Sequence, residues 1–258
     1  MTWALGNIGR VFLSFLSSIG RITLFLTHSL SQGLRPPYYS RQILHQFFEI
    51  GYLSLPVVGL TAFFTGMVLA LQSYTGFSRF NAENAIASVV VLSITRELGP
   101  VLGGLMVAGR IGASIAAEIG TMRVTEQIDA LISLSTSPQK YLIAPRLLAG
   151  VVMLPLLVIV ADTIGVFGGY IVSIYRLDFN SATYLKQTFD FMQMGDVTSG
   201  LIKAAVFGFI IALMGCYHGF NSKGGAEGVG KATTQAVVSS SILILIANYF
   251  LTSLLFEQ

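Results

Sequence analysis

Residues 96–129 read RELGPVLGGLMVAGRIGASIAAEIGTMRVTEQID, and they place two adjacent charges inside an apolar stretch. Arg96 and Glu97 are followed by Pro100 and by glycines at short intervals. Each charge near the centre of a membrane-spanning helix costs about 2.5–3.5 kcal/mol on insertion scales, so charges there usually have a role. The stretch therefore predicts a spanning helix that carries a polar site.

The composition of the whole chain also predicts an integral membrane protein. Of its 258 residues, 53% are hydrophobic and 10% are charged, whereas soluble domains carry about 25% charged residues. Uncharged runs of about 20 residues fit spanning helices rather than barrel strands. The net charge of +3 fits cytoplasmic loop bias better than nucleic-acid binding. A single cysteine, Cys216, excludes an internal disulfide and a cysteine metal cluster.

Hydropathy predicts one all-α membrane domain over residues 1–258, with a five-span core over 50–256. The second span contains Arg96 and Glu97, the third contains Asp162, and the fourth contains Lys203. The five predicted spans are residues 50–71, 86–108, 147–175, 197–217 and 232–256. A short helix is expected over 181–192, in the loop after the third span.

Residues 1–40 are apolar but interrupted by charge. The uncharged run between Arg10 and Arg21 is too short to span, so we expect an amphipathic helix in the membrane interface that ends at Pro36 and Pro37. A first spanning helix that tolerates Arg21 is the alternative. No signal peptide is expected, because the N-terminus lacks a basic region before an apolar core.

The distribution of Lys and Arg predicts the orientation of the spans. Three cationic residues, Arg79, Arg176 and Lys186, fall in loops on one side. Cytoplasmic loops carry the excess of Lys and Arg, so the N-terminus is expected inside and the C-terminus outside. The cations on the predicted cytoplasmic side are Arg10, Arg21, Arg35, Arg41, Arg110, Arg123, Lys140, Arg146, Lys223 and Lys231.

Depth along the spans predicts which charges meet. Arg96 lies about 21 Å along a helix from Arg110, and Lys203 lies about 9 Å from the outer end of its span, at 1.5 Å per residue. Adjacent helical residues do not face each other, so Glu97 is expected to pair with Lys203, and Asp162 to serve Arg96. This network either fixes helix register only or lines a polar cavity for a substrate head group or gate.

The loop 121–138 predicts an amphipathic cytoplasmic helix. Its apolar side holds Met122, Ile128, Leu131 and Ile132. Such a helix either docks into a groove on a partner protein or rests on the lipid interface. Its polar side holds Arg123, Glu126, Gln127 and Asp129.

Signals for catalysis or nucleotide binding are weak. Residues 225–231 read GAEGVGK, but Ala232 replaces the hydroxyl residue of a P-loop and no strand precedes it, so a flexible cytoplasmic turn is expected. His45 and Glu49 are four residues apart, yet two ligands do not make a metal site. No GxSxG or HExxH motif occurs.

The run RELGPVLGGLMVAGRIGASIAAEIGTMRVTEQIDAL closely resembles the core of the MlaE permease family. Members of this family are the membrane subunits of ABC transporters that move phospholipids and related lipids between bacterial membranes. The resemblance extends to GMVLALQSY at 66–74, SPQKYLIAPRLLAGVVMLPLL at 137–157 and GVGKATTQAVVSSS at 228–241.

The resemblance implies a homodimer in a bacterial inner membrane, with an interfacial helix and five spans per subunit. Its partners would be a cytoplasmic ABC ATPase, an outward-facing MCE-domain protein and, in some members, a STAS-domain regulator. The chain itself would bind no cofactor and catalyse no reaction, because ATP and magnesium belong to the ATPase.

The resemblance also implies two sets of functional residues. A coupling helix over 121–134 would dock on the ATPase, and Asn248 stands where some relatives carry an acid. The coupling residues are Glu118, Arg123, Glu126, Gln127 and Asp129. The cavity residues are Arg96, Glu97, Lys203 and Asn248, with Leu69, Leu71 and Val101 against acyl chains. The alternative function is an autonomous ion-coupled transporter or channel, and an intramembrane lipid enzyme is weaker because no nucleophile–base set is evident.

Overall fold

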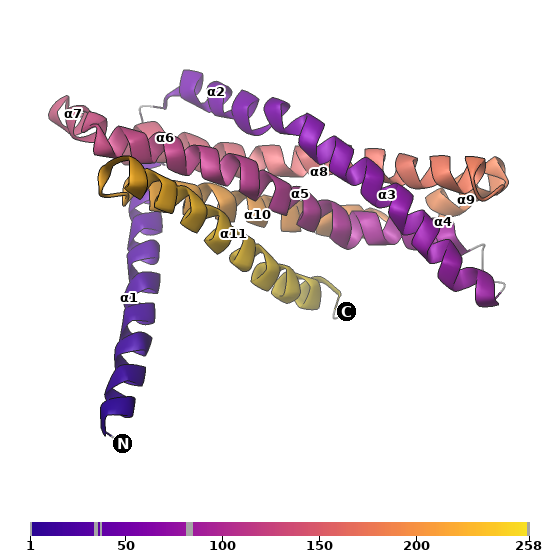
Figure 1. Ribbon diagram of the computed structural model, residues 1–258. Helices are drawn as coiled ribbons and strands as arrows, with labels where there is room; N and C mark the ends of the chain where they lie inside the picture. The colour runs from indigo at the N-terminus through magenta and orange to yellow at the C-terminus, as the bar shows by residue number, and fades with distance from the viewer. Residues whose placement is uncertain (1, 34–35, 37, 81–84, 257–258) are drawn as a thin grey trace.

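The computed structural model describes residues 2–33, 36, 38–80 and 85–256. It is all-helical over these residues (Figure 1). Five helices are long and apolar enough to cross a membrane, as the hydropathy predicts. They are Ser40–Phe77, Ile86–Val124, Gln139–Tyr175, Met194–Phe220 and Gly225–Leu255. Arg35 and Pro37, used above for the orientation and the end of the first helix, lie outside the described residues.

The five helices are longer than the apolar runs that predicted them. The first joins α2 (Ser40–Ile50) to α3 (Leu55–Phe77) through a short 3-10 turn at Tyr52–Ser54. The second does not end near Arg110 but continues to Val124. Backbone hydrogen bonding does not depend on hydrophobicity, so a helix can continue past the last apolar residue into the polar interface.

The second and third spanning helices contain π-helical turns. The second is built from α4 (Ile86–Ser93), α5 (Gly99–Val107) and α6 (Ala113–Val124), joined by π turns at Ile94–Leu98 and Ala108–Gly112. A third π turn at Gln139–Ile143 precedes α8 (Ala144–Tyr175). Such turns insert one extra residue and frequently mark functional sites.

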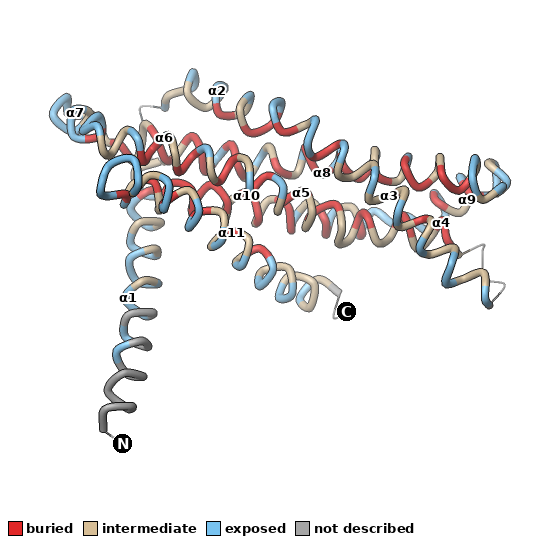
Figure 2. The backbone as a smooth tube through the Cα atoms, in the orientation of Figure 1, coloured by how far each residue is buried: buried red, intermediate tan, exposed pale blue. Residues whose placement is uncertain are grey.

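Helix α10 (Met194–Phe220) forms the centre of the bundle. It packs against α5, α6, α8 and α11 (Gly225–Phe256), and Figure 2 shows buried residues concentrated along α6, α8 and α10. Glycines permit the closest contact, because a Cβ on Gly150 of α8 would meet the carbonyl oxygen of Gly208 of α10 at 2.5 Å. Small residues at helix crossings allow this backbone approach.

The two short helices lie at opposite ends of the bundle (Figure 1). Helix α9 (Ser181–Phe191) confirms the helix expected over 181–192 and is capped by Asn180, whose side chain accepts from the Thr183 amide at 3.1 Å. Helix α7 (Gln127–Ser133) is at the other end. The prediction of one helix starting near Thr121 was wrong, because residues up to Val124 complete α6 and Glu126 interrupts the helix with φ 61°.

Helix α1 (Thr2–Gly33) stands apart from the bundle. Figure 1 shows it crossing the others at a steep angle and contacting them only near its C-terminal part, where Ile22, Phe25 and Leu26 pack against the core. A helix that lies in the membrane interface would have such an inclination, and the interfacial position of residues 1–40 stays a prediction.

The stretch 225–231 was expected to be a flexible turn, and this expectation was wrong. Its residues form the first turns of α11. Lys231 and Glu227 pair there at 2.7 Å, four residues apart on an exposed face. The glycines of the segment therefore begin a helix rather than a loop.

Candidate functional site

The π turn at Ile94–Leu98 positions the two charges that the sequence singled out. Arg96 and Glu97 are adjacent residues of this turn, and both find partners on α10. Asp196 and Lys203 of α10 are seven residues apart, which is close to two helical turns and places them on one face. One helix face thus binds two consecutive residues of another helix.

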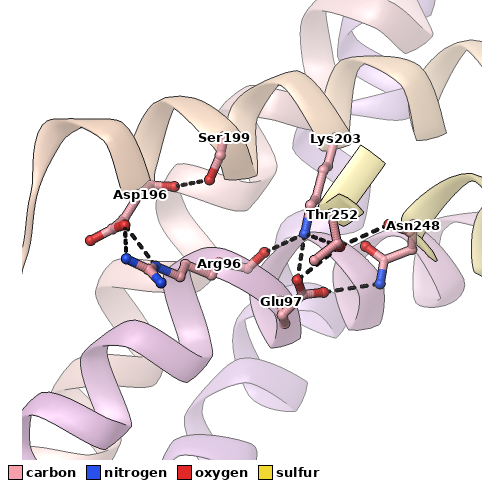
Figure 3. Close-up of polar contacts among 7 residues, drawn as sticks. All are labelled: Arg96, Glu97, Asp196, Ser199, Lys203, Asn248 and Thr252. Atoms are coloured by element: carbon pink, nitrogen blue, oxygen red, sulfur yellow. Dashed lines mark hydrogen bonds and ion pairs between the residues drawn. The ribbon is translucent and has the colours of Figure 1, made fainter. Parts of the chain in front are cut away.

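Glu97 lies at the centre of a polar cluster formed by three helices (Figure 3). Lys203 Nζ donates to Glu97 Oε1 at 2.6 Å, which confirms the predicted pair. Asn248 Nδ2 of α11 donates to Glu97 Oε2 at 2.9 Å. The Thr252 hydroxyl lies 3.0 Å from Glu97 Oε1 and accepts from Lys203 at 2.8 Å.

Lys203 is the most deeply buried charge of this cluster. Its side chain has 0% exposure, whereas that of Glu97 is 37% exposed. The Lys203 ammonium donates to Glu97, to Thr252 and to the carbonyl oxygen of Arg96 at 3.0 Å. An ammonium has three protons to donate, so these contacts satisfy a charge that burial would otherwise make very costly.

Arg96 pairs with Asp196 rather than with Asp162, so that part of the prediction was wrong. Arg96 Nε and Nη2 both donate to Asp196 Oδ1 at 2.6 Å. Asp196 lies in the first turn of α10, where its Oδ2 accepts from the Gln193 amide at 3.2 Å in a capping box. The carboxylate therefore caps the helix and binds Arg96 at once, which holds it inside the structure instead of in a loop.

Asp162 of α8 is buried on the other side of the π turn. In the described part of the chain its Oδ1 has no hydrogen-bond partner. A Cβ on Gly99 would overlap that oxygen, so the carboxyl group lies directly against the backbone of the second span. Asp162 shares the depth of the cluster and takes no part in it.

The two cations and two acids of the cluster balance one another. Arg96 and Glu97 remain 38% and 37% exposed, whereas their partners Asp196 and Lys203 are almost fully buried. The exposed members are therefore the groups that a substrate could reach, and the buried members hold them in place. This arrangement can present a guanidinium and a carboxylate to a polar head group.

A second set of ion pairs joins the helices near α7. Arg146 of α8, only 3% exposed, binds Glu118 of α6 at 2.6 Å, and its Nη1 donates to the Leu142 carbonyl at 2.8 Å. Arg123 at the end of α6 binds Asp129 of α7 at 2.7 Å. These pairs connect α7 to α6, and α6 to the third span.

Two further observations concern metal binding. Within residues 2–33, 36, 38–80 and 85–256 there is no group of three His, Cys, Asp or Glu side chains that could hold a metal ion. His45 and Glu49 lie 4.0 Å apart on α2, largely exposed.

Comparison with known proteins places the sequence in a family of membrane permeases. The family model described as Permease MlaE matches residues 43–254, most of the chain. The chain belongs to the MlaE permease family. A probable ABC transporter permease protein of Rickettsia felis is 60% identical over 251 residues, 97% of each chain. Another probable ABC transporter permease protein, from Synechocystis, is 44% identical over 217 residues, 84% of this chain and 82% of that one.

The family relationship extends to plants. The chloroplastic protein trigalactosyldiacylglycerol 1 of Arabidopsis thaliana is 38% identical over 226 residues, 87% of this chain and 64% of that protein. The MlaE match takes in nearly the full length of the five spanning helices and leaves the whole of α1 outside.

The MlaE resemblance also named apolar residues, which the structure does not bring together. Leu69 and Leu71 of α3 pack against the cluster around Val90 and Ile94. Val101 of α5 packs against the larger core. Their contact with acyl chains stays a prediction, as does a cavity shared by two permease subunits.

The sequence missed two members of the polar cluster, Asp196 and Thr252. Asp196 directly precedes the predicted fourth span at 197–217 and was left out of the spans, although its spacing of seven from Lys203 was a usable signal. Thr252 follows Asn248 by four residues on α11, and the same helical spacing places both on one face. Neither residue type alone indicates a site.

Proposed function

We propose that the chain is the membrane subunit of an ABC transporter that moves phospholipids or related lipids between membranes. The observation that carries this function is the polar cluster of Arg96, Glu97 and Lys203, set inside the spans of an MlaE permease. A transported lipid has both an apolar part and a polar head, and the half-exposed guanidinium of Arg96 is suited to a phosphate because its planar fork donates several bonds.

Names of relatives support the lipid assignment. Several relatives are named as probable ABC transporter permeases, and the Arabidopsis relative is named for trigalactosyldiacylglycerol, itself a glycerolipid. The chain would act without catalysis of its own, and a cytoplasmic ATPase would hydrolyse ATP. A homodimer, an MCE-domain partner outside and a STAS-domain protein inside complete the proposed assembly in a bacterial inner membrane.

The path of energy input would begin at α7. Glu126 and Gln127 are exposed there, and they would contact the ATPase together with Glu118, Arg123 and Asp129. When ATP closes the ATPase dimer, movement of α7 would pass to α6 through the Arg123–Asp129 pair. One continuous helix then leads from α6 to the π turn that carries Arg96 and Glu97.

The orientation proposed for this mechanism places α7 inside and α9 outside. The two helices lie at opposite ends of the bundle (Figure 1), and most Lys and Arg residues outside the spans belong to the α7 side. The N-terminus would then be cytoplasmic, and after five spans the C-terminus would be outside.

The test is purification of the tagged chain from its host membrane in mild detergent, followed by identification of bound proteins and lipids. Recovery of an ABC ATPase and of lipid, with ATP-dependent lipid movement after reconstitution in liposomes, is the expected result. An autonomous ion-coupled transporter would purify without an ATPase and would carry ion flux in the same liposomes. That second outcome would reject the lipid permease.

A further inference from the structure

A cavity separate from the Glu97 cluster lies where α1, α2 and α8 meet, at the end of the bundle that holds α7 (Figure 1). It has a volume of about 370 Å³. Its walls are mainly apolar, with Leu30 on α1, Ile43 on α2, and Leu147 and Val151 on α8. Ligand pockets typically measure about 300–1,000 Å³ and have largely apolar walls, so the cavity has the size and lining of a site for an apolar chain.

The cavity opens on the outer surface of the bundle. Leu30 and Leu148 line it and remain 45% and 47% exposed. Beside it α1 and α8 touch, because a Cβ on Gly33 would lie 3.0 Å from the Cβ of Ala144. Leu148 belongs to the third spanning helix, whose exposed apolar side chains face lipid in a membrane. An acyl chain of the bilayer can therefore reach the cavity from the side.

Lys140 is the charged residue of this cavity. Among the described residues that line the cavity, no other is charged. The Lys140 ammonium donates to the Pro36 carbonyl oxygen at 2.7 Å, and no ion pair in the described part of the chain includes it. By contrast, Arg146, Lys203 and Lys231 each bind an acid of the chain. An ammonium has three protons, so Lys140 can still donate to an anion from outside the chain.

Tyrosines beside Lys140 indicate that the mouth of the cavity lies at the head-group level of the membrane. Tyr38, which is 64% exposed, and Tyr39 both line the cavity. Tyr39 packs edge-on against Tyr141, the neighbour of Lys140, with ring centroids 5.0 Å apart. Tyrosine and tryptophan are enriched at membrane–water interfaces. In the orientation proposed above this is the cytoplasmic interface, where a basic residue attracts the anionic lipids of that leaflet.

We propose that this cavity binds an anionic phospholipid of the cytoplasmic leaflet, with one acyl chain against Leu147 and Val151 and its phosphate on the Lys140 ammonium. A free phosphate would gain nothing from the apolar walls, and a neutral lipid would gain nothing from the cation. The bound lipid would connect α1 to α2 and α8. Only the choice of leaflet rests on the proposed function. Binding requires neither ATP nor a partner ATPase and does not involve Arg96, so either proposal can fail without the other.

Photolabelling of the purified chain in detergent tests the site. The probe is phosphatidylglycerol that carries a diazirine in one acyl chain, and it is expected to label the peptides that contain Leu30 and Leu148. Unlabelled phosphatidylglycerol should compete, phosphatidylcholine with the same acyl chains should compete far less, and inorganic phosphate should not compete. Equal competition by the two lipids would overturn the proposal, because it would show an apolar groove that ignores the charge of the head group. Absence of label from both peptides would also overturn it.

Variants assign the labelling to Lys140. Lys140→Ala is expected to weaken labelling by about fivefold, the effect of one basic residue beside anionic lipid. Lys140→Arg keeps the charge and should retain the labelling. Lys223→Ala removes the same charge from an exposed position between α10 and α11 and should alter nothing. Equal weakening by Lys140→Ala and Lys223→Ala would refute the site, because it would show that net charge alone attracts the probe.

A second pair of variants keeps the test decisive if changes at Lys140 impair folding. Leu148→Trp fills the mouth of the cavity from an exposed position and leaves Lys140 intact, so it should block labelling of the Leu30 peptide. Leu156→Trp makes the same change further along α8, at a position that is 49% exposed and does not line the cavity, and it should leave labelling unchanged. Both variants should keep the elution profile of the parent chain. Labelling of the Leu30 peptide that persists in both Leu148→Trp and Lys140→Ala would refute the site.

Discussion

Lys203 and Glu97 form an ion pair in which only one partner is buried: the Lys203 side chain has 0% exposure and that of Glu97 has 37%. Loss of one partner from a fully buried pair costs about 3–5 kcal/mol, and the exposure of Glu97 reduces that figure through solvent screening. The ammonium is also held by the Arg96 carbonyl and by Thr252. The pair can therefore be altered without the whole helix contact being lost.

Reversal of either charge is expected to abolish lipid movement. Glu97→Lys places two cations together, and Lys203→Glu places two acids together, so each removes the polar site while α10 still packs through its glycines. Lipid transfer in reconstituted liposomes measures the effect, and co-purification of the ATPase measures assembly. Lys186→Glu, at an exposed position of α9, serves as the control.

Combining the two reversals should restore part of the stability but not all of it. The exchanged pair regains its Coulomb attraction, but the donor to the Arg96 carbonyl is lost. Wild-type lipid transfer by both single variants would contradict a functional role for the cluster. The cluster would then serve only to fix the register of the helices.

Asn248→Asp is expected to destabilise the cluster. The change removes the donor to Glu97 Oε2 at 2.9 Å and sets a second acid beside the first, a loss of about 1.5–3 kcal/mol for a hydrogen bond to a charged group. Thermal unfolding in detergent measures it. Adding Glu97→Gln should recover most of the loss. Asn180→Asp is the control, because Asn180 caps α9 by accepting from the Thr183 amide, a role that an aspartate keeps, so it should not destabilise the chain. A stable single variant would show that the cluster accepts an acid at this position.

The five spanning helices were predictable because each is a long apolar stretch with few charged residues, and burial of such stretches in a bilayer needs helices. The ends of these helices could not be predicted. The apolar run stops at the first charged residues, whereas the hydrogen-bonded helical backbone continues past them. The Glu97–Lys203 pair followed from depth along each helix. Asp196 did not, since its burial results from the capping box and the contact with Arg96, neither of which has a local signal.

The π turns and the break before α7 could not be predicted from the sequence either. A π turn differs from an α turn by one residue, and no composition marks it. At Glu126 a non-glycine residue takes a left-handed conformation, which propensity alone opposes. These features bring side chains to positions that a regular helix over 86–134 would not reach.

Glu118→Ala is expected to loosen the link between α6 and α8. Arg146 is 3% exposed and would lose its counterion, whereas Glu118 is 49% exposed, so the loss should lie below the range of about 3–5 kcal/mol for buried pairs. In the assembled transporter, less lipid should move per ATP hydrolysed. Glu227→Ala breaks a pair that is exposed on both sides and should change neither stability nor coupling. Equal effects of the two variants would show that the Glu118–Arg146 pair has no part in coupling.

Glu126→Gly is expected to stabilise the isolated chain. Glu126 has φ 61°, a conformation that costs an L-residue roughly 1–2 kcal/mol and costs glycine nothing. The greater freedom of glycine in the unfolded chain cancels part of this gain. Thr125→Gly, at φ −96°, offers no such relief and should lower the melting temperature. A lower melting temperature for both variants would mean that the Glu126 side chain makes a stabilising contact. Stabilisation together with weaker ATPase binding would assign the strained residue to the interface.

Gly99→Ala is expected to destabilise the contact between the second and third spans. The added Cβ would overlap Asp162 Oδ1 and lie 3.0 Å from the Ile94 carbonyl oxygen, and overpacking of this kind typically costs about 1–3 kcal/mol. Combining it with Asp162→Ala removes the obstructing carboxyl, so thermal unfolding should show recovery of most of the loss. Gly103→Ala is the matched control, because its nearest neighbour, Val158 Cγ2, would lie at 3.6 Å, an ordinary contact. At Gly103 the better helix propensity of alanine should dominate, so the variant should gain about 0.5–1 kcal/mol of unfolding free energy. If the double variant is no more stable than Gly99→Ala alone, the strain lies in the backbone of the π turn and not at Asp162.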